Sequence, residues 1–346
     1  MSEKIRVGII GYGYASKTFH APLIAGTPGL VLSAISSSDA GKVAADWPSV
    51  PVVSSPQALI ADPELDLIII PTPNDTHYPL AKAALEAGKH VVVDKPFTVT
   101  LSQARELEEL AAKRGLLLSV FHNRRWDSDF LTVRELISSG TLGEVASFES
   151  HFDRFRPQVR ARWREQTGAG TGIWYDLGPH LIDQALVLFG KPVSINVDLA
   201  QLRPGAETTD YFHAVLTYPQ RRVILHGTML AAAESARYIV HGTRGSYVKF
   251  GLDPQEDRLK AGERLPQEDW GYDMRDGELT LAQGDELDKR PWLTQPGNYP
   301  AYYAAIRDAL NGQGENPVPA SQAITVMELI ELGIASAERR ATLPLI

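Results

Sequence analysis

An apolar run that leads directly into a glycine-rich turn stands at the start of this chain. Residues 5–10 read Ile-Arg-Val-Gly-Ile-Ile, and Gly11-Tyr12-Gly13-Tyr14-Ala15-Ser16 follows. Gly11 permits a tight turn, and Gly13 has no side chain to keep a pyrophosphate from the backbone. N–H groups of a following helix would face the phosphates. An ordinary glycine turn is the alternative, but the strand-turn-helix context favours a dinucleotide site, with Ser16 in place of a third glycine.

Strand-like and helix-like segments alternate over the first third of the chain. Apolar runs at 30–35, 65–70, 90–93 and 116–121 are separated by amphipathic segments at 14–25, 40–47, 76–87 and 100–114. Thr100 and Gln103 have the spacing of a helix capping box, and Gly115 can end that helix. Strands that are apolar on both faces and alternate with helices predict a parallel sheet covered on both sides. We therefore predict a Rossmann dinucleotide-binding domain over residues 1–122.

The remaining residues, 123–346, predict an α+β domain with a large, mostly antiparallel open sheet. Short strand-like runs at 144–152, 193–202, 211–218, 223–230, 238–241 and 247–250 are separated in several places by turn signals. Helices are expected at 129–139, 300–310 and 321–339, whereas the polar segment 253–297 predicts long loops with one short hairpin. The fold class is α/β. The outer face of an open sheet needs a cover, so we expect a homodimer or homotetramer formed through it.

Composition excludes several classes of function. The chain has no cysteine, which rules out disulfides, thiolate metal sites and thiol nucleophiles. Its formal net charge is -8, which argues against general binding of nucleic acid or anionic membranes. The sequence lacks both an apolar run long enough to span a bilayer and the apolar core of a signal peptide. We expect a cytoplasmic protein.

Two further motifs suggest catalytic chemistry. Asp94-Lys95-Pro96 follows an apolar run, and ligands of open α/β sheets bind where the strands end. Lys95 could reach both a cofactor and a reacting oxygen, with Pro96 fixing the backbone through a cis bond. Asp176 and His180 are four residues apart where a helix is expected to start near residue 176 or 177. The alternatives are a solvated loop lysine, a helix N-cap and a buried structural histidine.

The order of these motifs resembles the Gfo/Idh/MocA family of NAD(P)-dependent sugar and inositol dehydrogenases, over essentially the whole chain. That family usually has Glu-Lys-Pro where this chain has Asp94-Lys95-Pro96. The segments 122–127, 162–165, 175–178 and 211–213 are similar to a branch of NADP-dependent scyllo-inositol dehydrogenases. The resemblance implies hydride transfer between nicotinamide and a secondary alcohol.

The resemblance also implies residue roles. Lys95, Asp176 and His180 would be catalytic, with His180 as general base, Lys95 at the reacting oxygen and Asp176 at a neighbouring hydroxyl; these roles could be exchanged among the three. Cofactor contacts are expected from Gly11, Tyr12, Gly13, Tyr14, Ser37, Ser38, Thr72, Asn74, His77, Lys95, Trp163 and Arg164. Substrate contacts are expected from Lys95, Asn123, Arg154, Asp176, His180 and Tyr299. Local structural support is the alternative for Trp163, Arg164, Asn123, Arg154 and Tyr299, and for His77 it is preferred. No metal is expected at this site.

The end of the second strand distinguishes the two nicotinamide cofactors. An NAD site usually has an acidic residue there, which binds the ribose 2′-hydroxyl. We place Ser37 at that position, with Lys42 nearby for a 2′-phosphate, and therefore expect NADP. A register shift of two residues would bring Asp39 there and favour NAD. The function expected is oxidation of a polyol or sugar, with two alternatives: an NADPH-dependent reductase of another small carbonyl, or a catalytically silent nucleotide-binding regulator.

Overall fold

The computed structural model describes residues 4–345, and the chain forms two compact units. The first contains the chain up to Trp126 together with 254–270 and 298–324. The second contains 127–253, 271–297 and the chain from Thr325 on. Two segments from the second half of the sequence therefore belong to the N-terminal unit.

The first unit is built on a six-stranded parallel sheet with the order β3-β2-β1-β4-β5-β6. Its strands are β1 (Ile5–Ile10), β2 (Leu30–Ser36), β3 (Val52–Val53), β4 (Leu67–Ile70), β5 (His90–Val93) and β6 (Leu118–Val120). The central strands β4 and β5 are almost entirely buried, as expected when helices cover both faces. The predicted Rossmann fold is confirmed.

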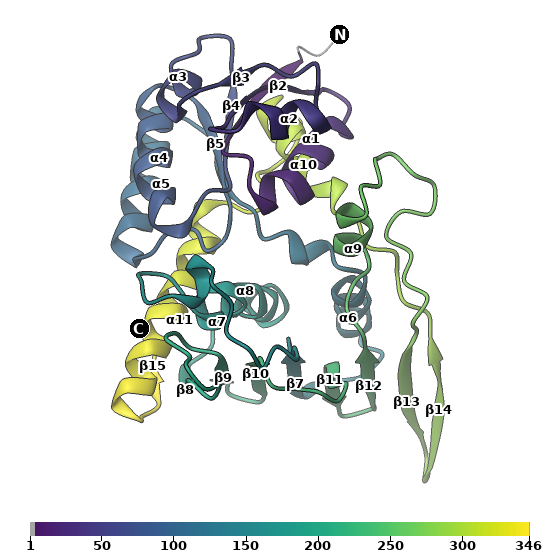
Figure 1. Ribbon diagram of the computed structural model, residues 1–346. Helices are drawn as coiled ribbons and strands as arrows, with labels where there is room; N and C mark the ends of the chain where they lie inside the picture. Colours follow the sequence, from purple (N-terminus) through teal and green to yellow (C-terminus); the bar gives the residue numbers. More distant parts are fainter. Residues whose placement is uncertain (1–3, 346) are drawn as a thin grey trace. The chain divides into compact units, whose positions relative to one another are not determined.

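Helices cover both faces of this sheet (Figure 1). In Figure 1, α4 (Asn74–Glu86) and α5 (Leu101–Arg114) lie together on one side, and α1 (Ala21–Ala25) lies with α10 (Pro300–Leu310) on the other. The predicted capping box is present: the Thr100 hydroxyl accepts from the Gln103 N–H, and the Gln103 side chain accepts from the Thr100 N–H. Short helices at α2 (Ala40–Asp46) and α3 (Pro56–Ile60) complete the set.

The segment predicted as long loops contains a helix as well as the expected hairpin. Helix α9 (Gln255–Lys260) joins the first unit, and strands β13 (Gly277–Gln283) and β14 (Glu286–Trp292) form the hairpin. Six residues are too few for a periodic apolar pattern. The helix forms because Gln255 and Leu259 are buried, and because its acidic first turn and basic last turn complement the helix dipole.

The second unit is built on a nine-stranded sheet with the order β14-β13-β12-β11-β7-β10-β9-β8-β15. Besides the hairpin, its strands are β7 (Val145–His151), β8 (Ser194–Ala200), β9 (Tyr211–Thr217), β10 (Arg222–Thr228), β11 (Ala236–Gly242), β12 (Gly245–Phe250) and β15 (Leu343–Pro344). All neighbouring pairs are antiparallel except β7 and β10. The prediction of a large, mostly antiparallel sheet is confirmed.

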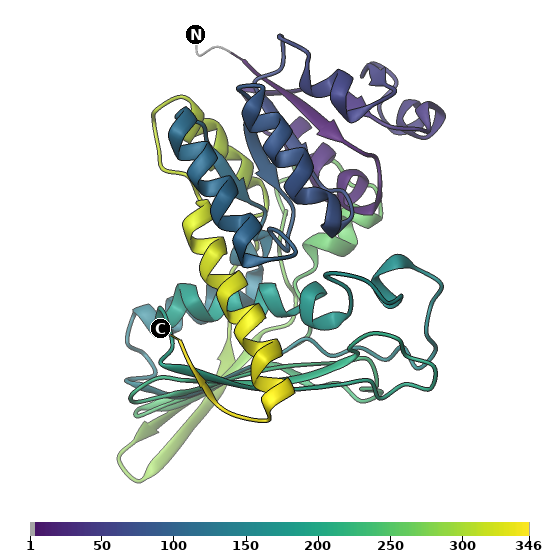
Figure 2. The same cartoon turned by 90° about the vertical axis from the view of Figure 1, so that its left-hand side faces the viewer.

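One face of this sheet packs against helices and the other does not. Helices α6 (Ser128–Ser138), α7 (Ile173–Asp176) and α8 (Gly178–Phe189) lie along the same face, with the second half of α11 (Ala320–Arg339) (Figures 1 and 2). Along β9, Phe212, Ala214 and Leu216 are fully buried, whereas the alternate residues are partly exposed. Within residues 4–345 no helix covers this outer face. None of the described helices has the length and apolar character needed to cross a membrane.

Candidate active site

The N-terminal candidates gather at the carboxyl edge of the parallel sheet. Neighbouring strands β2, β1, β4, β5 and β6 are followed by Ser37, Gly11, Thr72, Lys95 and Asn123 respectively. The register supports this arrangement because Val93 lies beside both Ile70 and Val120, the last residues of their strands. Ligands of open α/β sheets bind at this edge.

The glycine turn leaves its backbone accessible. Gly11 has φ +84°, a conformation that favours glycine, and the Ser16 hydroxyl donates to the Gly11 carbonyl at 2.8 Å. A Cβ on Gly13 would meet nothing within 4 Å, so space for a phosphate lies above this backbone. The hydroxyls of the two turn tyrosines point to structural partners, from Tyr12 to Asp46 at 2.9 Å and from Tyr14 to Glu256 at 2.6 Å.

Helical structure begins directly after this turn. Residues from Tyr14 to Ala25 are helical, with a π-helical stretch, η1, over Ser16–His20. The predicted strand-turn-helix unit is therefore present, and its first helical residues follow Gly13 as the phosphate site requires.

The end of β2 places a hydroxyl and not an acid at the first position after the strand. Strand β2 ends at Ser36, and Ser37 follows it. The Asp39 carboxylate caps α2 by accepting the Lys42 N–H at 2.9 Å. The Lys42 amine lies 5.9 Å from the centre of the Tyr12 ring, beside the glycine turn. Ser37 and Lys42 thus lie next to the predicted dinucleotide site, and the Asp39 carboxylate caps α2.

The turn after β4 is tied to the turn after β5 by His77. One ring nitrogen of His77 lies 2.9 Å from the Thr72 carbonyl and the other lies 2.8 Å from the Pro96 carbonyl. The Thr76 hydroxyl donates to the Thr72 hydroxyl at 2.6 Å. Burial lowers the pKa of His77 despite the nearby Asp94 carboxylate. His77 thus joins the two turns, and Thr72 and the buried Asn74 lie at the carboxyl end of β4, where a cofactor contact is predicted.

Lys95 is held by the residue before it. The peptide bond between Lys95 and Pro96 is cis, as predicted, and the Lys95 N–H donates to the Asp94 carboxylate at 2.8 Å. The second Asp94 oxygen lies 3.8 Å from His20, whose other ring nitrogen lies 2.6 Å from the Tyr303 hydroxyl. Burial raises the pKa of Asp94, but His20, Lys95 and His77 outweigh it and lower the pKa overall. No local pattern identified His20 or Tyr303, which lie far from Asp94 along the chain.

Asp176 and His180 belong to the second unit and stand at a junction between two helices. Helix α8 begins at Gly178, after Asp176, so the expected start at 176 or 177 is early by one or two residues. Asp176 ends α7 and does not cap α8, whose N-terminus has no side-chain cap. Its oxygens lie 3.5 Å from Arg164 and 3.9 Å from Arg154. His180 is buried in the first turn of α8.

The segment that carries Trp163 and Arg164 is anchored by ion pairs. The Arg164 guanidinium lies 4.3 Å from the centre of the Trp163 ring. Next to it, the Glu165 carboxylate pairs with Arg162 at 2.6 Å and with the buried Arg203 at 3.0 Å. These contacts hold the short helix η3 (Trp163–Glu165) in place and direct Arg164 towards Asp176.

The remaining substrate candidates differ in exposure. Asn123 is buried at the start of the short helix η2 (Asn123–Trp126) that follows β6. Arg154 is partly exposed beside Asp176, with its guanidinium 4.8 Å from the centre of the Phe152 ring. Tyr299 is fully buried, its ring packs edge-on against Phe19, and it directly precedes α10. This burial favours a packing role for Tyr299.

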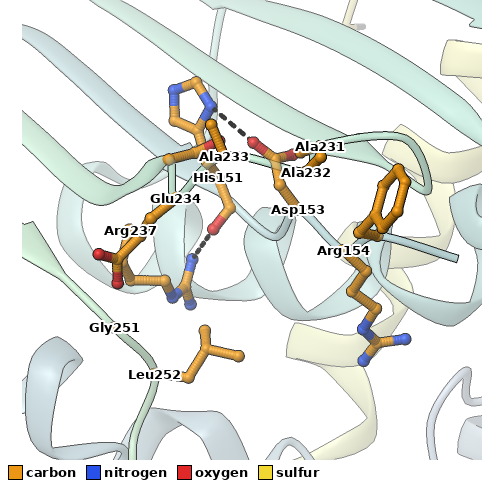
Figure 3. A pocket seen from close by; sticks show the side chains of 12 residues that line it. His151, Asp153, Arg154, Ala231, Ala232, Ala233, Glu234, Arg237, Gly251 and Leu252 are labelled. Atoms are coloured by element: carbon orange, nitrogen blue, oxygen red, sulfur yellow. Dashed lines mark hydrogen bonds and ion pairs between the residues drawn. The ribbon is translucent and has the colours of Figure 1, made fainter.

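A polar hollow of about 340 Å³ adjoins Arg154 in the second unit (Figure 3). Charged and polar side chains from β7, β11 and the segment before β11 share it with small and apolar ones. Its lining residues are His151, Asp153, Arg154, Phe155, Ala231, Ala232, Ala233, Glu234, Ser235, Arg237, Gly251 and Leu252. In Figure 3, Arg154 lies on one side and Arg237 with Glu234 on the other. Apart from Arg154, none of these residues was predicted from the sequence, because their spacing matches no local motif.

Comparisons with known proteins show the family to which the two units belong. The profile of the oxidoreductase family NAD-binding Rossmann fold (Gfo/Idh/MocA) matches residues 5–122, and that of the family's C-terminal alpha/beta domain matches 134–345. The chain is 79% identical to the uncharacterized oxidoreductase YdgJ of Escherichia coli, over 99% of both chains. It is 39% identical to the scyllo-inositol 2-dehydrogenase (NADP(+)) IolW of Bacillus subtilis, over 99% of this chain and 96% of the relative.

Solved structures show the same fold. A structure described as a proposed oxidoreductase of Yersinia pestis, YPO2259, superposes with a TM-score of 0.97 at 71% identity, over 100% of this chain and 98% of that one. The oxidoreductase YvaA of Bacillus subtilis, also described as proposed, superposes with a TM-score of 0.97 at 39% identity, over 100% and 99% of the two chains. With its NAD-binding Rossmann domain and its C-terminal sheet domain, the chain is an NAD(P)-dependent oxidoreductase of the Gfo/Idh/MocA family.

Proposed function

We propose that this oxidoreductase transfers a hydride between NADP and a secondary alcohol or ketone of a polyol or sugar, with scyllo-inositol as the first candidate. The main support is the position of Lys95 at the carboxyl end of β5, on the sheet edge that also carries the open glycine turn. The similarity to IolW supports the substrate class and the choice of NADP.

In this proposal the protein residues remove one proton from the substrate and stabilise the charge on one oxygen atom. NADP would supply the hydride chemistry at nicotinamide C4. His180 would take the hydroxyl proton as general base, and Lys95 would donate a hydrogen bond to the same oxygen and stabilise its developing charge. Asp176, ion-paired with Arg154 and Arg164, would accept a hydrogen bond from a neighbouring hydroxyl. The mechanism requires Lys95 and His180 to reach the same substrate oxygen, on the carbon that exchanges the hydride.

The other proposed contacts follow the geometry of each unit. The backbone from Gly11 to Tyr14 would contact the pyrophosphate, and Ser37 and Ser38 the adenine ribose. Thr72, Asn74, Trp163 and Arg164 would complete the cofactor site. Asn123 and Arg154 would bind substrate hydroxyls, which suits the polar hollow beside Arg154. His77 would support the cofactor site indirectly, because it joins the turn after β4 to the turn after β5.

The test of function is a panel of inositols, aldoses and their keto forms, with both nicotinamide cofactors, followed at the nicotinamide absorbance. We expect turnover of scyllo-inositol or a related polyol with NADP. Lys95→Ala and His180→Ala should each lower kcat/KM by at least about a hundredfold, from the typical contribution of one oxyanion donor or general base. NADPH affinity, measured by fluorescence, should stay within about threefold of wild type for His180→Ala.

The same panel separates the alternatives. Turnover only with NADPH and a small non-sugar carbonyl would replace the polyol proposal by a reductase of that carbonyl. Tight NADPH binding without turnover of any polyol or carbonyl would favour a silent nucleotide-binding regulator. Wild-type activity in Lys95→Ala would contradict the proposed catalytic residues.

The cofactor preference rests on Ser37 and Lys42. An acidic side chain at the end of β2 would bind the ribose 2′-hydroxyl of NAD and repel the 2′-phosphate of NADP. Ser37→Asp should therefore reduce kcat/KM for NADP at least tenfold and raise it for NAD. Lys42→Ala should weaken NADP without improving NAD. A strong wild-type preference for NAD would contradict this assignment, because Asp39 would then have to fill the acidic position.

Assembly and location complete the proposal. A homodimer or homotetramer formed through the outer face of the nine-stranded sheet would cover the face that no described helix covers. A cytoplasmic location is proposed because the cytoplasm supplies NADP and NADPH, and cell fractionation tests it.

A further inference from the structure

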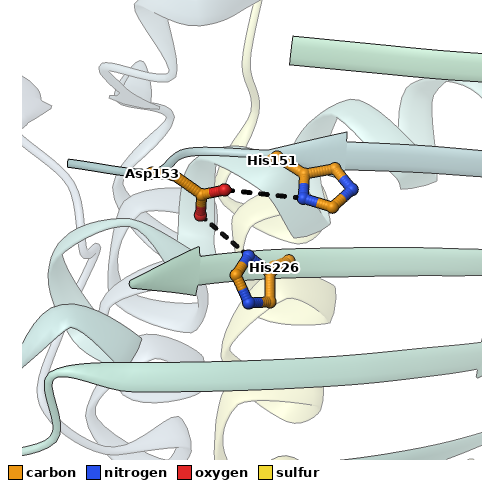
Figure 4. A group of neighbouring side chains, drawn as sticks. All are labelled: His151, Asp153 and His226. Atoms are coloured by element: carbon orange, nitrogen blue, oxygen red, sulfur yellow. Dashed lines mark hydrogen bonds and ion pairs between the residues drawn. The ribbon is translucent and has the colours of Figure 1, made fainter. Parts of the chain in front are cut away.

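Three side chains outside the proposed catalytic residues converge on the outer face of the nine-stranded sheet (Figure 4). They are His151 at the end of β7, Asp153 two residues further on, and His226 on β10. Each offers one ligand atom, and these atoms all lie within 4.8 Å of one another. We propose that His151, Asp153 and His226 form a binding site for a divalent transition-metal ion, with Zn²⁺ as the first candidate.

The donor atoms are spaced as metal ligands are. The Asp153 oxygens lie 2.7 Å from Nδ1 of His226 and 3.6 Å from Nδ1 of His151, and both imidazoles face the same carboxylate (Figure 4). Tetrahedral Zn²⁺ with bonds of about 2.0–2.1 Å holds its nitrogen and oxygen ligands about 3.3 Å apart. The two carboxylate distances bracket that value, and the ligand atoms of the two histidines, within 4.8 Å of each other, would have to come closer by side-chain rotation. Two histidines and one carboxylate suit Zn²⁺, Co²⁺ and Ni²⁺.

A further carboxylate orients one of the ligands. Oε2 of Glu149 lies 3.2 Å from Nε2 of His151, on the side of the ring away from Asp153. A metal-bound imidazole usually donates its other N–H to a carboxylate, which fixes the tautomer and makes the free nitrogen a better ligand. Glu149 is placed to accept that N–H and so leave Nδ1 of His151 available for a metal ion.

The backbone holds the site rigid while one side stays open. His226 lies directly opposite His151 in the parallel pair of β10 and β7, and the Phe152 N–H donates to the His226 carbonyl at 2.9 Å. The two imidazole rings are 5.1 Å apart, centre to centre. In a single chain the side chains of His151 and His226 are 20% and 17% exposed, which leaves room for an ion and a water ligand before any second copy covers this face.

A hydrogen-bonded cluster that binds no metal is the competing interpretation. In that case Asp153 would simply accept from His226 and neutralise the histidines that tie the two strands together. The two interpretations make different predictions for added Zn²⁺. A metal site binds the ion at these three side chains, whereas a purely hydrogen-bonded cluster does not.

The experiment is calorimetric titration of Zn²⁺ into full-length, metal-stripped protein without a histidine tag. We expect one ion per chain and a higher thermal unfolding temperature when Zn²⁺ is present. His226→Ala and Asp153→Asn should weaken binding at least tenfold, and Glu149→Gln by about tenfold, which is typical of a residue that orients a metal ligand. His241→Ala is the matched control, since His241 is exposed on neighbouring β11 and its ring nitrogen lies 2.7 Å from the Ser246 hydroxyl. Its affinity should equal that of wild type.

Co²⁺ provides a readout that does not depend on the variants folding. Bound to the wild-type protein in place of Zn²⁺, it should give the visible absorption of a four- or five-coordinate site, and Zn²⁺ should displace it. Absence of Zn²⁺ binding at about 100 μM, or equal binding by His226→Ala, would overturn the proposal. So would a Co²⁺ spectrum identical to that of the free aqueous ion.

Discussion

At the scale of single residues, the environment decides what a side chain of a given type does. Histidine shows this well. Burial lowers the pKa of His77, which lies between two backbone carbonyls. Burial also acts to lower the pKa of His151, but the Asp153 and Glu149 carboxylates outweigh it and raise the pKa overall. Sequence motifs identified His180, whereas His151 is distinguished by its position opposite His226 on the neighbouring strand β10.

Gly13 offers a test of the cofactor site that leaves the fold intact. A Cβ at this position would meet no neighbouring atom, so Gly13→Ala should unfold within about 1 °C of wild type. If the pyrophosphate contacts this backbone, the added methyl group should weaken NADPH binding at least tenfold. Fluorescence titration with NADPH and thermal unfolding measure the two effects. Unchanged affinity would place the pyrophosphate elsewhere.

At the scale of elements, a short helix without a sequence signature supports the glycine turn. Glu256 of α9 accepts a hydrogen bond from Tyr14 and pairs with Arg124 at 2.8 Å and Lys260 at 3.0 Å. Burial raises the pKa of Glu256, but Arg124, Tyr14 and Lys260 outweigh it and lower the pKa to about 2. Helix α9 is therefore attached by a charge cluster to the residues around the predicted cofactor site.

This pKa shift predicts a defined dependence of stability on pH. Because the pKa of Glu256 is lower in the folded protein than in the unfolded chain, its contribution is complete above about pH 4.5 and is lost as the pH falls towards 2. The shift corresponds to at most about 3 kcal/mol, less solvent screening of this partly exposed group. Urea unfolding should show Glu256→Gln destabilised at pH 7, with a smaller difference at pH 3.

A matched variant checks that the effect is local. Glu109→Gln, on the exposed surface of α5, should leave stability at both pH values close to that of wild type. Equal destabilisation of Glu256→Gln at pH 7 and pH 3 would contradict the assigned ion pairs.

At the scale of the whole molecule, the outer face of the nine-stranded sheet has no covering helix among the described residues. It carries partly exposed apolar side chains such as Val215 and Ile224, which are direct neighbours on β9 and β10. A sheet face of this kind is suited to pairing with a second copy, because symmetric contacts can bury these side chains.

Sedimentation velocity tests this pairing directly. We expect wild-type protein to sediment as a dimer or tetramer. Val215→Glu, which places a charge in the middle of the face, should dissociate it, whereas Val187→Glu on α8, against the opposite face, should not. A wild-type monomer at about 10 μM would contradict the assembly proposed here.

Local patterns were sufficient to predict much of the fold. The apolar runs and helix signals predicted the parallel sheet, the Thr100 capping box and the Gly115 helix end, all of which are confirmed. These features depend on residues close together in the sequence. The short helix α9 and the brief strand β3 were missed because so few residues leave no periodic pattern, and their stability comes from burial against distant segments.

The sequence by itself determined the two-domain architecture and the family, because strand periodicity, glycine turns and short motifs act over a few neighbouring residues. Only the tertiary structure decided which side chains share a site. Asp94 lies beside His20, and His20 contacts Tyr303. His151 lies opposite His226 on the neighbouring strand. In each case the partners are far apart in sequence. The register of paired strands and the packing of helices fix such contacts, and no local pattern encodes either of them.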